Sequence, residues 1–237
     1  MSIRISANNM GLERTTNLPT TSSFLVMGKT YLVSDRTSAA SQHLMGFNAN
    51  GGGDLACRLA FGDFSNNMTL FGYDAGSTNT FVNFASRPAI NRWFFWYVQC
   101  TGTGAGLLSG GWGYCDDTSA MVTPAAITLG AANTTFNKLR IGNLPNQATD
   151  FWADARHEYI GCFNTTWTAA QLNRQRYRRA MVSTASVNFW VPASDTSSVA
   201  NAVKDYSGNS RDLTATATPT IEANTSNVCV NPYSRIV

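Results

Sequence analysis

Side chains capable of acid–base or nucleophilic chemistry are few in this chain and far apart. The histidines are His43 and His157, and the glutamates are Glu13, Glu158 and Glu222. A nucleophilic triad needs a histidine beside its nucleophile, and glycoside hydrolysis needs two carboxyl groups within about 10 Å of each other. Because no two glutamates are close in sequence, the chain shows no catalytic spacing, and we predict that it is not an enzyme.

The other acidic and histidine positions have simpler interpretations. Adjacent Asp116 and Asp117 would point to opposite faces of a strand, and their glycine-rich neighbourhood favours a solvated turn. His157 stands near Asp150 and Asp154 and could bind a metal with them, but the strand-like sequence around it favours a hydrogen-bonded residue of a sheet. The sequence therefore predicts no cofactor at these positions.

Two aromatic residues lie among glycines, in Gly110-Gly111-Trp112-Gly113-Tyr114. Aromatic rings that small neighbours leave uncovered can stack on the face of a sugar ring. Trp112 and Tyr114 are therefore candidate glycan-binding residues, and packing of both rings in the core is the alternative.

A turn near the end of the chain carries several oxygen ligands. Asp205, Asn209 and Asp212 lie close together in sequence, and calcium prefers such carboxylate and amide oxygens. In an Asx turn the same side chains bind nearby backbone groups and explain the pattern without a metal. We expect such a turn, with a calcium site as the second interpretation.

Four arginines, Arg174, Arg176, Arg178 and Arg179, lie in or just after a predicted helix. Each contributes +1, so without them the formal net charge of the chain would fall from +3 to −1. Cations near a helix C-terminus offset its dipole; docking on an acidic protein surface is the functional interpretation. Nucleic acid is not an expected partner, because aromatic and basic residues are not interleaved.

The rest of the sequence predicts a series of short strands. Only 13% of residues are charged, and apolar runs alternate with segments rich in glycine, serine, threonine and asparagine, which suits strands joined by tight turns. The predicted strands are Phe24–Val33, His43–Phe47, Arg58–Phe61, Met68–Tyr73, Phe81–Phe84, Trp93–Cys100, Met121–Leu129, Lys138–Ile141, Glu158–Phe163 and Phe189–Val191. Helices do not alternate with them, so an all-β antiparallel sandwich is favoured over a parallel sheet.

One short helix is predicted. Thr168 and Gln171 have the spacing of a capping box, and the helix is expected to run to about Met181. Residues 1–23 are polar and irregular, and are predicted to be an extended arm or the first edge of the sandwich.

The cysteines are odd in number and lack paired spacing; they are Cys57, Cys100, Cys115, Cys162 and Cys229. We predict free buried thiols and assembly in a reducing compartment. The sequence contains no run of about 18 apolar residues, so no membrane span is predicted. The first residues lack the apolar centre of a signal peptide.

Several segments resemble laminin-G-like (concanavalin A-like) jelly-roll domains. They are Trp93–Val98, Leu139–Gly142, Tyr159–Trp167 with its capped helix, and Val187–Pro192 with Asp205–Leu213. The last pair resembles the opening of such a domain, although it comes late here, so the resemblance implies a permuted strand order. It also implies one domain over residues 24–237, which residues 187–237 complete.

The resemblance also suggests a function. Laminarinase-like enzymes of this fold carry Glu-x-Asp-x-Glu on one strand, which this chain lacks, so a glycoside hydrolase is a remote alternative. The chain is similar to accessory proteins of tailed-phage virions. We therefore expect a non-catalytic structural or decoration protein on a virion surface, capsid or tail, assembled in the host cytoplasm, with capsid proteins, copies of itself and surface glycans as partners. A free, extracellular carbohydrate-binding module is the alternative.

Overall fold

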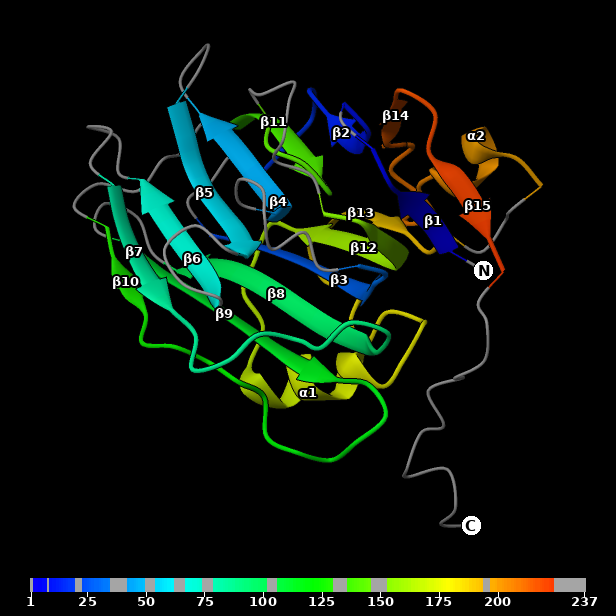
Figure 1. Ribbon diagram of the computed structural model, residues 1–237. Coiled ribbons are helices and arrows are strands. Elements are labelled where there is room, and N and C mark those ends of the chain that lie inside the picture. The colour runs from blue at the N-terminus through cyan, green and yellow to red at the C-terminus, as the bar shows by residue number, and fades with distance from the viewer. Residues whose placement is uncertain are drawn as a thin grey trace, which may run out of the picture.

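The computed structural model describes residues 2–7, 9–19, 23–34, 42–49, 54–61, 67–73, 79–101, 106–129, 136–145, 153–193 and 197–223. Within these residues the strands form two antiparallel sheets packed face to face, with short helices outside them (Figure 1). The predicted antiparallel β-sandwich is confirmed. One short helix, α2 (Val199–Ala202), was not predicted.

The sheets differ in size within the described part of the chain. The larger sheet has the order β10 (Ile127–Thr128), β9 (Leu107–Tyr114), β8 (Trp93–Thr101), β3 (Phe24–Leu32), β12 (Ala155–Phe163), β1 (Ser2–Ile5) and β15 (Thr220–Glu222), with β13 (Val187–Val191) also paired to β12. The smaller sheet has the order β14 (Thr214–Thr216), β2 (Gly11–Arg14), β11 (Phe136–Ile141), β4 (Gln42–Ala49), β5 (Asp54–Phe61), β6 (Met68–Tyr73) and β7 (Asn79–Asn83).

The central strands of the larger sheet are buried on both faces, which explains their unbroken apolar runs. In β8, Phe94 and Trp96 point into the core between the sheets. Phe95 and Tyr97 point to the opposite face, where they pack in a second apolar cluster with Leu172 of α1 (Ala169–Arg176). Figure 1 shows α1 against this outer face. α1 therefore covers part of the outer face of the larger sheet.

The predicted capping box is present at the start of α1. Gln171 N donates to Thr168 Oγ1 over 3.3 Å, and Thr168 N donates to Gln171 Oε1 over 2.9 Å. The helix ends at Arg176, about one turn earlier than predicted, because the Gln175 side chain binds the chain that follows: its amide donates to the carbonyls of Arg178 and Ala180. No helix in the described ranges is long and apolar enough to span a membrane.

The N-terminal segment is built into both sheets. β1 lies between β12 and β15, and β2 lies between β11 and β14. Ile3, Ile5 and Leu12 are fully buried in the core. Residues 1–23 were predicted to be an extended arm or the first edge of the sandwich. The described strands favour the second alternative, because their apolar side chains point into the core.

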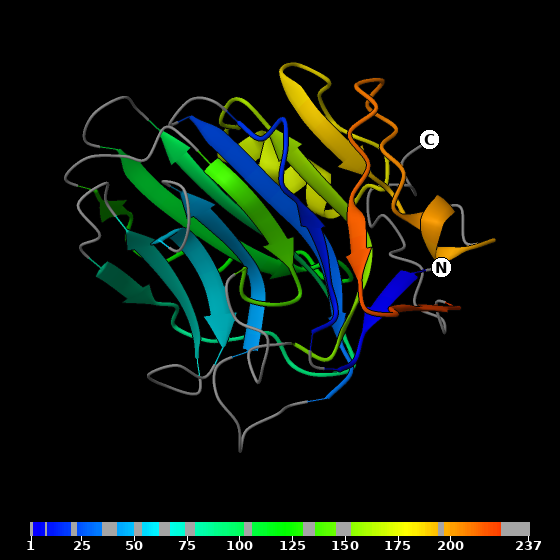
Figure 2. The same ribbon diagram turned by 90° about the horizontal axis from the view of Figure 1, so that it is seen from above.

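The segment after residue 187 also contributes to both sheets. β13 pairs with β12, which pairs with β3 on its other side, so Phe189 lies one strand away from the Phe24–Leu32 strand. β15 pairs with β1, and the two lie side by side in both views (Figures 1 and 2). Early and late residues of the chain thus occupy adjacent strands, an arrangement that tolerates permuted connections.

Candidate functional site

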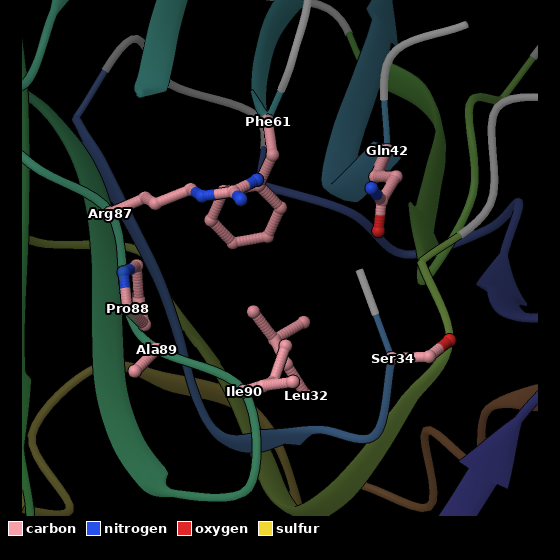
Figure 3. Close-up of a pocket in the computed structure, with 8 residues that line it drawn as sticks. All are labelled: Leu32, Ser34, Gln42, Phe61, Arg87, Pro88, Ala89 and Ile90. Carbon is pink, nitrogen blue, oxygen red and sulfur yellow. The ribbon is translucent and has the colours of Figure 1, made fainter. Parts of the chain in front are cut away.

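A pocket of about 300 Å³ lies where strand ends from both sheets meet the loop between β7 and β8. Its lining residues are Leu32 and Ser34 at the end of β3, Gln42 at the start of β4, Phe61 at the end of β5, and Arg87, Pro88, Ala89 and Ile90 in the loop (Figure 3). The volume is within the range of small-molecule sites in proteins.

The pocket combines a closed apolar floor with an open rim. Leu32 and Phe61 are 5% and 1% exposed, whereas Ile90 at the rim is 44% exposed. Ser34, Gln42 and Arg87 add a hydroxyl, an amide and a guanidinium to the lining. A ligand here meets hydrogen-bonding groups and apolar surface together.

The loop wall is held in place by the two aromatic residues singled out in the sequence. Trp112 Nε1 donates to the Ser86 carbonyl over 3.2 Å, and the Tyr114 hydroxyl accepts from Ala89 N over 2.8 Å. The Arg92 guanidinium lies 3.6 Å from the centre of the Tyr114 ring. Trp112 and Tyr114 therefore fix the loop that forms one wall of the pocket, through hydrogen bonds to its backbone.

The prediction that these rings form an exposed stacking platform is wrong for Trp112, which is 3% exposed. Tyr114 is half-buried, with one contact to the Trp112 ring at 5.1 Å and the other to Arg92. The core-packing alternative describes Trp112, and Tyr114 packs between its two neighbours.

Arg176 is a structural residue. Its side chain is 1% exposed and donates to the Ser119 carbonyl over 2.6 Å, to Asp117 Oδ1 over 2.7 Å and to the Tyr114 carbonyl. A buried guanidinium with several acceptors fixes the chain segments that supply them. The docking role predicted for Arg176 is wrong, because none of its donors faces solvent.

The other three arginines of the cluster differ from one another. Arg174 and Arg178 are exposed. Arg179 forms an ion pair with the buried Glu158. A four-arginine docking patch is therefore absent, but Arg174, Arg178 and Arg179 all keep the surface position that the docking interpretation requires.

The adjacent aspartates lie in the turn that follows β9, as predicted, with Asp116 exposed and Asp117 half-buried. Asp116 and Asp117 both form ion pairs with Arg92, at 2.6 and 2.7 Å, and the hydrogen bonds that Arg92 donates to Asp116 raise the pKa of Arg92. Asp117 also binds Arg176, so this turn joins two arginine side chains. Arg92 also lies over the ring of Tyr114, whose hydroxyl accepts from Ala89 N.

Asp205 is the centre of an Asx turn. Its carboxylate accepts from the backbone N–H groups of Trp190, Ser207 and Arg211 over 2.8 to 2.9 Å. Burial alone would raise the pKa of Asp205, but these hydrogen bonds outweigh it and lower the pKa below its ordinary value. The first interpretation of this segment, a turn, agrees with these bonds.

The same turn covers the outer edge of β13. Asp212 Oδ1 accepts from Asp205 N over 2.8 Å, and Asn209 Nδ2 donates to the carbonyls of Val187 and Asn188. The Asp205 carboxylate and Asp212 Oδ1, considered as calcium ligands, thus accept hydrogen bonds from the backbone. Among the described residues, no group of three or more histidine, cysteine, aspartate and glutamate side chains could hold a metal ion.

We expect Asp205→Ala to lower the free energy of unfolding by about 2 kcal/mol, because it removes the acceptor of several partly buried N–H groups. The stabilisation from Asp205 should be present above the ordinary pKa of aspartate and be lost as pH falls through the lowered folded-state value. Urea denaturation at pH 7 and below pH 4 measures both effects. A melting temperature of the unmutated chain that rises with calcium, and no longer does so in Asp205→Ala, would favour the metal interpretation instead.

The three glutamates are engaged in ion pairs: Glu13 with Lys138, Glu158 with Lys29, and Glu222 with Arg4. None of them lines the pocket. Glu158 and Lys29 are 4% and 3% exposed, on the side of the sheet that α1 covers. Their positions give no pair of carboxyl groups facing a common ligand.

The histidines are buried residues of the sandwich. His157 Nδ1 lies 3.0 Å from Thr30 Oγ1, which also accepts from Trp96 Nε1 over 2.8 Å. Burial lowers the pKa of His157 to about 3 and that of His43 well below its usual range. Asp154, considered as a metal partner of His157, instead accepts from Ser34 and Arg4; Asp150 lies outside the described residues.

The described cysteines are free and buried, as predicted; they are Cys57, Cys100, Cys115 and Cys162, and Cys229 lies outside the described ranges. Burial raises the pKa of Cys100 to about 11, and it also raises the pKa of Cys57 and Cys162. These thiols stay protonated near neutral pH, which makes them unreactive.

The pocket residues were not among the sequence-predicted sites. One signal in the sequence was available: Arg87-Pro88-Ala89-Ile90 places apolar residues between two strands, without the period of either a strand or a helix.

No protein-family model matches the sequence, and no curated protein matches it either. Solved structures do match in fold. A heptameric SAP-like pentraxin from Limulus polyphemus is 10% identical, covers 76% of this chain and 84% of its own, and gives a TM-score of 0.53. The CBM40 of a Ruminococcus gnavus IT-sialidase, bound to alpha2,3 sialyllactose, is 11% identical, covers 74% and 96%, and gives 0.52.

A Trypanosoma rangeli sialidase in complex with the inhibitor DANA is 11% identical with a TM-score of 0.54, but the match spans 75% of this chain and only 27% of the sialidase. At these identities the likeness concerns the fold alone. The chain has the jelly-roll, concanavalin A-like sandwich that the sequence motifs predicted.

Proposed function

We propose that this protein is a non-catalytic glycan-binding sandwich whose site is the pocket between Leu32, Gln42, Phe61 and the Arg87–Ile90 loop. The observation that carries the proposal is the mixed lining of that pocket, polar and apolar, at the strand ends. Sugars present hydroxyl groups beside apolar C–H surface, so they need both kinds of contact. A domain of the same fold from Ruminococcus gnavus binds alpha2,3 sialyllactose, which supports a sugar site on this type of sandwich.

None of the lining residues in the described part of the chain carries a carboxylate, which supports a binding role over hydrolysis. The ionisable residue among the lining side chains is Arg87. Glycoside hydrolases of the common types use two carboxyl groups on either side of the bond that they cleave. The described pocket therefore offers recognition without an acid and a base.

The virion role was expected from the resemblance to accessory proteins of tailed-phage virions, and it stays a prediction. An N-terminal arm and an arginine cluster were the contacts expected with a larger assembly. The described residues before residue 20 include two strands inside the sheets, and Arg176 is buried. Decoration of a virion is compatible with a glycan pocket; both this location and the extracellular alternative stay predictions, which fractionation of purified virus particles would test.

The proposal predicts that Ile90→Ala weakens glycan binding by about tenfold, because it removes apolar contact at the rim. A glycan array identifies the ligand, and calorimetry gives its affinity for each variant. Leu107→Ala is the matched control, since Leu107 is 48% exposed, close to the 44% of Ile90, but does not line the pocket. Equal binding by both variants would place the site elsewhere.

We also expect Tyr114→Phe to reduce glycan affinity severalfold without contact between Tyr114 and the ligand. The change keeps the ring but removes the acceptor of Ala89 N, so the wall of the pocket becomes less ordered. Tyr159→Phe is the control, because its hydroxyl donates to Gln175 on the α1 side of the sheet. Both variants should lose about 1 kcal/mol of stability, but only Tyr114→Phe should lose affinity.

A further inference from the structure

We infer that the ligand of this pocket is a terminal sugar that carries a methyl-ended substituent, either an acetamido group or the methyl of a 6-deoxy sugar. The inference rests on the proposed function and adds the chemical class of the ligand. Three features of the pocket carry it: its size, its closed floor and the uneven distribution of its polar groups.

The size and the floor favour the end of a glycan over an internal stretch. A volume of about 300 Å³ is at the lower limit for ligand pockets, which suits one sugar ring. Leu32 and Phe61 are nearly inaccessible at the floor, while Ile90 is open at the rim. This volume therefore suits a single terminal ring better than an internal stretch of a longer glycan.

The polar groups are gathered on part of the lining. Figure 3 shows Pro88 and Ala89 along one side, Ile90 and Leu32 next to them near the centre, and Gln42 and Ser34 on the side opposite. Arg87 and Phe61 lie between the two sides. The lining is therefore amphipathic, and its apolar part is formed by Pro88, Ala89 and Ile90 of the loop and by Leu32 at the end of β3.

This distribution disfavours a plain hexose. A hexose carries a hydroxyl or hydroxymethyl group on nearly every ring carbon, so one or more of its hydroxyls would face the Pro88–Ile90 side without a hydrogen-bond partner. Burying an unpaired hydroxyl is costly. A methyl group directed at Ile90 and Leu32 removes that cost and adds apolar burial, while the ring hydroxyls face Gln42 and Ser34.

The expected preference can be stated as a ratio. Burial of one methyl-sized group corresponds to about a fourfold gain in affinity. We expect methyl N-acetyl-β-D-glucosaminide to bind at least about fourfold more tightly than methyl β-D-glucoside. The same ratio is expected for methyl 6-deoxy-α-D-galactoside over methyl α-D-galactoside, and comparison of the two pairs distinguishes an acetamido from a 6-deoxy ligand.

The experiment is a titration of the full chain with each of these four glycosides, with ligand-observed NMR as the measurement of binding. At least one methyl-bearing sugar should be preferred over its plain partner. Ile90→Ala should reduce that preference to nearly equal binding, and Leu107→Ala should preserve it. Plain hexoses that bind as tightly as their methyl-bearing partners, or a preference unchanged in Ile90→Ala, would overturn this inference and leave the glycan-binding proposal standing. Failure of all four glycosides together with every glycan on an array would overturn both.

Discussion

Replacing Ile3 and Ile5 by alanine is expected to leave the protein largely unfolded. Both side chains are fully buried in the main core, and each large-to-small change in a core costs about 2–5 kcal/mol. The sum approaches the whole stability of an ordinary domain, about 5–15 kcal/mol. Circular dichroism and urea denaturation of the single and double variants measure the loss.

Ile90→Ala is the matched control for this experiment, because Ile90 is the same residue type at 44% exposure, and its replacement should change stability by about 0.5 kcal/mol or less. The same measurement shows that the pocket variant is folded. A double variant of Ile3 and Ile5 as stable as the unmutated chain would contradict the integration of β1 into the sandwich and restore the arm interpretation of residues 1–23.

Arg176→Met is expected to lower the free energy of unfolding by about 3 kcal/mol. The methionine fills much of the same space, but it leaves the buried carbonyls of Ser119 and Tyr114 without their donor and breaks the ion pair with Asp117. Denaturation in urea gives the size of the effect.

Arg174→Met provides the comparison within the same helix. Arg174 is exposed, so its replacement should change stability by about 0.5 kcal/mol or less. Equal stability of the two variants would indicate that the Arg176 side chain is solvated. Arg176 would then again be a candidate docking residue.

The strands that are buried on both faces were the most predictable part of the fold. Met68–Tyr73 was predicted with its observed limits, and Trp93–Cys100 within one residue. In β8 the apolar run is continuous because the core covers one face and the α1 cluster covers the other. Such a run predicts a strand even when the neighbouring strands are unknown.

β9 was missed because its glycines indicate a loop when considered alone. In the structure, a Cβ at Gly111 would overlap the ring of Tyr97, and one at Gly113 would come within 3.0 Å of the Arg176 guanidinium. The glycines make room for side chains of a neighbouring strand and helix. This requirement belongs to tertiary packing, so the local sequence does not reveal it, and the same glycines wrongly suggested that Trp112 is uncovered.

β1 and β2 were missed because each is four residues long and pairs with strands distant in sequence. Ile3 pairs with His157, and Leu12 pairs with Ile141. The alternation of Ile3 and Ile5 was a signal, but polar residues on either side obscured it. The pocket was harder still to predict, since its lining comes from segments at the ends of β3, β4 and β5 and from a loop.

The central claim is that a glycan occupies the pocket beside Ile90. The most direct measurement is a methyl-resolved NMR titration of the whole protein with the tightest-binding glycan from an array. The account predicts that the methyl signals of Leu32, Ala89 and Ile90 shift together with the ligand concentration, while that of Leu107 stays in place. Shifts confined to methyl groups outside the pocket, or saturable binding by no glycan on the array, would contradict it.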